Sequence, residues 1–149
     1  MKFTCSVDIA LPIDKTVALW DNPDNLKKWQ DGFLGFESIS GTPGQEGSKS
    51  KLLYKMGGGK MELLETVTKN NLPHEFSGLY EHKHMTNTMS NKFTALDANK
   101  TRWEADIEYI ELKALVPRLM FKLFPGMARK QTQKWLDQFK EFAEKEGNL

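Results

Sequence analysis

The sequence predicts an α+β fold in which a curved antiparallel sheet of about seven strands wraps around a long carboxy-terminal helix, with two short helices after the first strand. Polar and apolar residues alternate through most of residues 49–113, as in half-buried strands. Over residues 116–146, apolar residues recur at helical spacing and fall on one helix face. Both patterns fit one domain spanning residues 1–149, because a chain of this length buries about 70% of its unfolded surface.

The elements at the start of the chain are short. Alternating side chains predict a strand over residues 2–9. Pro12 then opens a helix, because its fixed backbone angle suits the first helical turn. Asn22 and Pro23 are the residue types that serve as N-cap and first residue of a second short helix, which Gly32 ends.

Turn-forming residues divide the middle of the chain into consecutive strands, with the most prominent loop at residues 41–47. Their short connections imply antiparallel neighbours, because parallel strands need long crossovers. Pro125 is expected either to kink the final helical region or to divide it into a short helix at 116–124 and a long one at 126–146. The expected strands are residues 33–40, 49–56, 60–69, 74–84, 87–96 and 101–112.

Composition limits the class of protein. The 21 basic and 20 acidic residues give a net charge of +1, which offers no electrostatic reason to expect nucleic acid. The single cysteine, Cys5, cannot form an internal disulfide, and neither a secretory signal nor an apolar run of about 18 residues is visible. We therefore expect a soluble cytoplasmic protein without a cofactor or stable membrane insertion. The sequence leaves its oligomeric state open.

Several features together resemble a known family. They are the order of elements, Trp20-Asp21 at the end of the first helix, Trp29 after the second, the glycine-rich loop at 41–47 and the long final helix. This pattern resembles the START-like superfamily, also called SRPBCC, which includes polyketide cyclase and lipid-transport-like proteins and the major birch pollen allergen. The resemblance covers the whole chain and implies a helix-grip fold around a hydrophobic cavity that binds lipids, sterols, hormones or polyketides. It carries over no catalytic residue, because the superfamily shares no catalytic set.

The inward faces of the strands supply candidate ligand-binding residues, which are mainly aromatic or methionine with a few polar groups. The candidates are Tyr54, Met56, Tyr80, His82, Met89, Asn91, Trp103 and Tyr109 from the strands and Met120, Phe124 and Trp135 from the helices. The same composition also suits a filled core. The register of strand 87–96 is the least defined, because a slip of one residue would replace Met89 and Asn91 with Thr88 and Ser90.

Two histidines form the most specific local pattern. At positions i and i+2 of one expected strand, His82 and His84 share a face with their Cα atoms about 6.5–7 Å apart. A metal site needs a third ligand, and His74 lies too far along the strand to provide it, so no metal is expected. A general acid or base role for His82 stays open, because imidazole titrates near neutral pH.

Basic residues in the final helical region, among them Arg118 and Lys122, lie near the aromatic pair Phe121 and Phe124. This arrangement would suit transient membrane docking of a lipid carrier. The solvated face of an amphipathic helix explains the same charges more simply.

Three functions stay open at this point. The first is a non-enzymatic carrier or sensor of a hydrophobic small molecule. The second is an enzyme of the cyclase or hydratase kind acting on a polyketide-like substrate, with His82 and Tyr80 or Tyr109 as its acid–base pair. The third is a protein-interaction module with a filled core and an exposed apolar patch.

Overall fold

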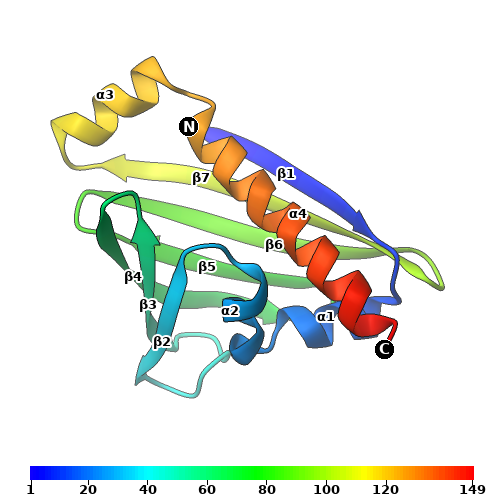
Figure 1. The fold of residues 1–149 in the computed structure, drawn as a ribbon. Helices are drawn as coiled ribbons and strands as arrows, with labels where there is room; N and C mark the ends of the chain where they lie inside the picture. Colours follow the sequence, from blue (N-terminus) through cyan, green and yellow to red (C-terminus); the bar gives the residue numbers. More distant parts are fainter.

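The computed structural model describes residues 1–149 and shows a curved seven-stranded antiparallel sheet around a long helix (Figure 1). The strand order is β1-β7-β6-β5-β4-β3-β2, so that consecutive strands from β2 to β7 are neighbours and β1 pairs with β7. This is the expected meander. The strands are β1 (Lys2–Ile9), β2 (Phe33–Ser40), β3 (Lys49–Met56), β4 (Gly59–Asn71), β5 (Glu75–Glu81), β6 (Met85–Asp97) and β7 (Lys100–Leu112).

The helices begin and end close to the residues that the sequence indicated. Pro12 immediately precedes the first helix, and the Asn22 side chain caps the next one by accepting a hydrogen bond from the Asp24 backbone N–H at 3.0 Å. Phe124 and Gly126 flank the break between the last two helices, which confirms the division at Pro125. The helices are α1 (Ile13–Trp20), the 3₁₀ turn Pro23–Asn25 with α2 (Leu26–Trp29), α3 (Leu115–Leu123) and α4 (Met127–Gly147).

The core lies between the sheet and the second half of α4, which runs across the concave face in Figure 1. Trp103 of β7 packs edge-on against Phe139 of α4 with ring centroids 5.4 Å apart, and Trp29 of α2 contacts the same phenylalanine at 5.1 Å. These aromatic rings fill one end of the space inside the sheet. The other end lies beneath α3, a helix with no buried residue.

Strand parity is confirmed where the strands are regular. Leu52 and Tyr54 are buried on β3, and Asn91 and Phe93 are buried on β6, so the uncertain register is the one in which odd-numbered residues face inward. A bulge between Thr86 and Asn87 absorbs the irregularity at the start of β6.

One strand boundary is wrong in the sequence prediction. We expected a strand over 74–84, but β5 ends at Glu81. The residues that follow form a tight hairpin, closed by a hydrogen bond from the His82 N–H to the Met85 carbonyl at 2.8 Å. Strand alternation therefore does not extend to His82 and His84.

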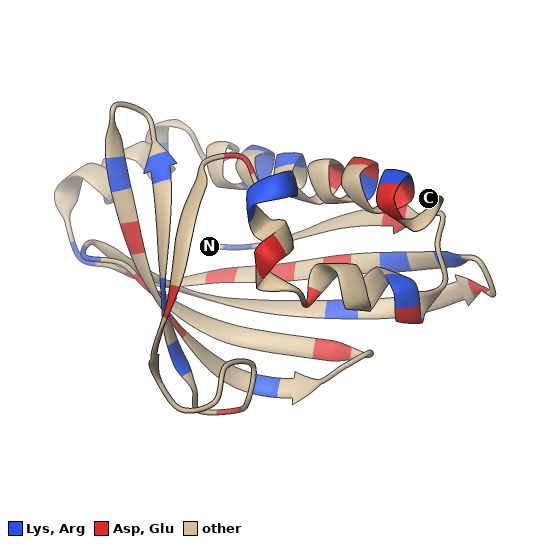
Figure 2. Cartoon of the chain, turned by 60° about the horizontal axis from the view of Figure 1, so that its bottom comes forward, with Lys and Arg blue, Asp and Glu red and all other residues tan.

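Both signs of charge are distributed along the strands and α4, as Figure 2 shows. The first turns of α4 carry only basic residues, and its later turns carry both signs. None of the helices combines the length and the apolar composition that crossing a bilayer requires.

Candidate functional site

A cavity of about 900 Å³ lies between the concave face of the sheet and helices α2, α3 and α4. Of its 39 lining residues, 24 are hydrophobic. It extends from Trp103, which is 2% exposed, to Phe124 beside α3, which is 53% exposed, and therefore opens to solvent near that helix. An apolar pocket of this size suits a small organic ligand, because such sites typically measure about 300–1,000 Å³.

The structure brings all but one of the predicted site residues to this cavity. Met56, Met120 and Phe124 lie at its exposed end, whereas Asn91 and Trp103 lie at its buried end. The lining includes the predicted residues Tyr54, Met56, Tyr80, Met89, Asn91, Trp103, Tyr109, Met120, Phe124 and Trp135.

His82 is the exception and does not line the cavity. It lies in the β5–β6 hairpin, where its Nδ1 accepts a hydrogen bond from the His84 backbone N–H at 3.2 Å. Burial, with smaller effects of His84 and Lys83, lowers the pKa of the His82 imidazole. No three potential metal-ligating side chains meet anywhere in the chain. The proposed acid–base pair of His82 with Tyr80 or Tyr109 is therefore not assembled.

An aromatic pair borders the cavity between the sheet and α4. The ring of Tyr54 stacks on the indole of Trp135 with centroids 5.6 Å apart. The Tyr54 hydroxyl donates to Gln30 Oε1 at 3.0 Å, and the Trp135 Nε1–H donates to the Asp31 carbonyl at 3.0 Å. Both polar tips thus have partners, and both residues line the cavity.

A half-buried acid on β4, Glu65, was not predicted from the sequence. Glu65 lines the cavity, and its Oε2 accepts a hydrogen bond from the Tyr80 hydroxyl at 2.7 Å. Burial raises the pKa of the Glu65 carboxyl above its usual range, and the Tyr80 hydrogen bond offsets only part of that rise. A signal was present: Glu65 falls between Leu63 and Val67 on the apolar face of an alternating strand.

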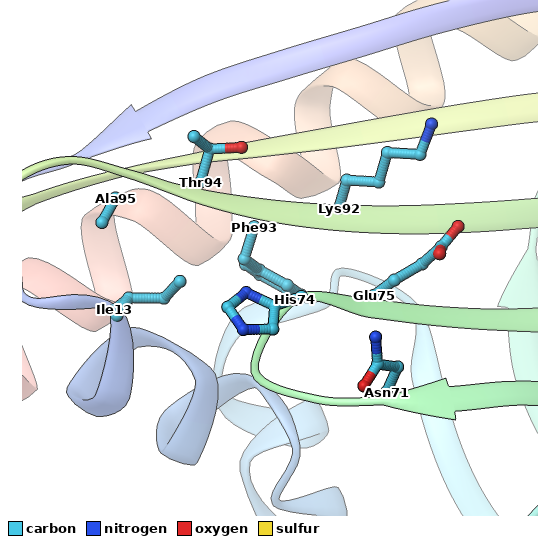
Figure 3. A pocket seen from close by; sticks show the side chains of 8 residues that line it. All are labelled: Ile13, Asn71, His74, Glu75, Lys92, Phe93, Thr94 and Ala95. Atoms are coloured by element: carbon cyan, nitrogen blue, oxygen red, sulfur yellow. The ribbon is translucent and has the colours of Figure 1, made fainter.

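A second hollow of about 520 Å³ lies at the other end of the sheet, where β5 and β6 approach the start of α1 (Figure 3). His74, Glu75 and Lys92 contribute most of its polar groups, and it has only eight lining residues. Most of its lining side chains are exposed, and only three of the eight residues, Ile13, Phe93 and Ala95, are hydrophobic. The larger cavity is therefore the better candidate for a ligand site.

Comparison with known proteins places the fold. No protein-family model matches the chain, and no curated protein matches its sequence significantly. An aromatase/cyclase from Streptomyces superposes with a TM-score of 0.81 at 11% identity, over 97% of this chain and 93% of that one. A START superfamily protein from Mycobacterium smegmatis gives a TM-score of 0.75 at 15% identity, over 94% and 97%. A protein from Thermus thermophilus gives 0.78 at 14% identity, over 96% and 97%.

The chain therefore has the helix-grip fold of the START-like superfamily, and the resemblance found in its sequence is confirmed at the level of the fold.

Proposed function

We propose that this protein binds a hydrophobic small molecule inside the helix-grip cavity and acts as its carrier or sensor. The observation that carries the proposal is the continuous, mostly apolar cavity of about 900 Å³ between the sheet and α4. Every 100 Å² of apolar ligand surface removed from water there would contribute about 2.5 kcal/mol. A lipid, a sterol or a polyketide-like molecule fits this description.

The cavity argues against the alternative of a protein-interaction module with a filled core. Aromatic side chains such as Trp29, Trp103 and Phe139 fill only the end beneath the second half of α4. Interior space that is not filled by side chains costs packing energy, so a fold that keeps it open gains that energy back when a ligand occupies the site.

An enzymatic function is the second candidate, and the hydrogen bond between Glu65 and Tyr80 favours it. A carboxyl whose pKa is raised by burial beside apolar side chains keeps its proton to a higher pH than an exposed carboxyl does, as a general acid requires. The aromatase/cyclase fold neighbour makes a cyclase or hydratase the reaction class to test. Turnover that is lost in Glu65→Gln and kept in Glu62→Gln, a change on the exposed face of the same strand, would establish it.

We also propose transient contact with an anionic membrane surface through α3. Leu115, Leu119 and Leu123 form a stripe at i, i+4 and i+8 that is 78%, 49% and 58% exposed and does not line the cavity. Residues 113–136 contain six lysines and arginines and no acidic residue, whereas the rest of the chain is more acidic than basic. A basic helix with an exposed apolar stripe suits the interface of anionic lipids, and its place at the cavity mouth would let an apolar ligand avoid water.

Native mass spectrometry of gently purified protein, with organic extraction of the bound material, tests the proposed binding function. A discrete adduct in the lipid or polyketide mass range would support it and identify the ligand class. A clean apo mass from the native host, with no thermal shift across a panel of lipids and sterols, would count against it.

A further inference from the structure

Four polar side chains form one continuous row across the wall of the cavity. The strand register pairs Glu65 of β4 with Tyr80 of β5, Tyr80 with Asn87 of β6, and Asn87 with Tyr109 of β7. All four residues line the cavity, so directly opposed positions on four adjacent strands place their polar groups on the same side of the sheet. We call these four residues the polar row.

Apolar residues border the polar row on one side, and two of them, Met89 and Ile107, also line the cavity. Two residues along each strand, the register aligns Val67, Gly78, Met89 and Ile107. None of these residues has a polar side-chain group. Gly78 makes room for the row, because a Cβ at that position would lie 3.0–3.2 Å from ring and hydroxyl atoms of Tyr80. The polar row is therefore a hydrogen-bonding band bordered on this side by apolar residues.

The protonation state of Glu65 determines whether a charged or an uncharged ligand group can bind at the polar row. The structure shows no ion pair to its carboxyl group, and its one hydrogen-bond donor is the Tyr80 hydroxyl. One phenol does not replace the hydration of a carboxylate, so burial favours the neutral acid. The cationic side chains that line the cavity, Lys130 and Lys134, are both exposed residues of α4.

We propose that the polar row is a subsite for an uncharged oxygen of the ligand, a hydroxyl or a carbonyl, to which Glu65 donates a hydrogen bond as the neutral carboxylic acid. This inference rests on the proposed binding function and deepens it by naming the ligand chemistry. A carboxylate placed at the row would lose its hydration with no cation beside it. A protonated amine would need Glu65 to ionise in the apolar cavity before the two could pair.

A matched ligand series tests the subsite. Decanol, decanoate and decylamine share one chain and differ only in the head group, and their binding can be measured at neutral pH by displacement of prodan, a neutral naphthyl ketone dye. We expect decanol to bind about tenfold more tightly than either charged ligand, because decanol gains the hydrogen bond from Glu65 without carrying a charge into the cavity. Glu65→Gln should keep decanol affinity within about threefold, because the amide still donates, whereas Glu65→Leu should lower it by about tenfold.

The controls separate this inference from the binding function. Glu62→Leu changes an exposed residue on the outer face of the same strand and should leave decanol affinity unchanged. One outcome would overturn the subsite and leave the binding function intact: Glu65→Leu binds both prodan and decanol as tightly as wild type does. The proposal would also be overturned if decylamine bound most tightly of the three ligands and lost its higher affinity in Glu65→Gln, because this result would show that Glu65 is ionised. No binding of prodan or any series member would overturn the binding function and the subsite together.

Discussion

The indole Nε1–H of Trp103 donates a 3.0 Å hydrogen bond to Oδ1 of Asn91 at the buried end of the cavity. The Asn91 amide nitrogen in turn donates to the Phe76 backbone carbonyl at 3.2 Å. Both side chains are almost fully buried, at 2% and 1% exposure, so these hydrogen bonds have no water to replace them. The pair fixes the Trp103 ring, which contacts Phe139 of α4, and therefore connects the cavity floor to the core.

Loss of this pair should destabilise the fold. Asn91→Ala leaves the Trp103 N–H buried without an acceptor, and we expect the free energy of unfolding to fall by about 2–3 kcal/mol in urea titrations. In a Trp103→Phe background the same substitution should cost about 1 kcal/mol less, because no orphaned donor remains. Equal costs in the two backgrounds would contradict the role given to the hydrogen bond.

Glu65 should make stability depend on pH. Its folded-state pKa is raised above the ordinary value of 4.5, so above that pH the folded chain holds a proton that the unfolded chain has released. Unfolding free energy should therefore fall as pH rises above 4.5 and level off once the folded-state carboxyl has ionised. Urea titrations of Glu65→Gln across the same range should lack this component, and Glu62→Gln should retain it. If the difference in unfolding free energy between wild type and Glu65→Gln does not vary with pH, Glu65 is not the source of the pH dependence.

Gly78 should control the position of Tyr80. Gly78→Ala places a Cβ about 3.0 Å from the Tyr80 ring, which must shift away from its present site. We expect prodan binding to weaken by several-fold and unfolding free energy to fall by about 1–2 kcal/mol. Gly58→Ala is the matched control, because nothing lies within 4 Å of its added Cβ. If both variants behave alike, the close packing of Gly78 against Tyr80 has no consequence.

The α3 stripe should bind anionic vesicles. The double substitution Leu115→Glu and Leu119→Glu removes two exposed apolar anchors and adds negative charge, so flotation with phosphatidylcholine–phosphatidylglycerol vesicles should fall by about tenfold or more. Leu96→Glu makes one such substitution at an exposed position near the end of β6 and should have no effect. Wild-type protein that fails to float with these vesicles but captures a specific protein would favour a protein partner for α3.

The fold could be predicted from the sequence because local patterns were consistent with one another. Pro12, Asn22 and Pro23 marked the helix starts, and strand alternation gave the inward faces of β3 and β7. These signals depend on neighbours a few residues apart, which the sequence displays directly.

The site was only partly predictable, because it depends on where strands end and on how they align. His82 was assigned to the cavity because β5 was expected to end at residue 84, three residues later than it does. Glu65 was missed because its significance comes from Tyr80, fifteen residues away and directly opposite on β5. Cross-strand register creates that contact, and no local pattern shows it.

Titration of prodan into the wild-type protein and two tryptophan variants tests the central claim most directly. Met89→Trp adds an indole inside the cavity, whereas Thr88→Trp adds the same group to the outer face of the same strand. We predict saturable binding to wild type, a loss of about tenfold or more in Met89→Trp because the ligand space is occupied, and unchanged affinity in Thr88→Trp. Absence of saturable binding to wild type, or equal affinity in both variants, would contradict a ligand-binding cavity.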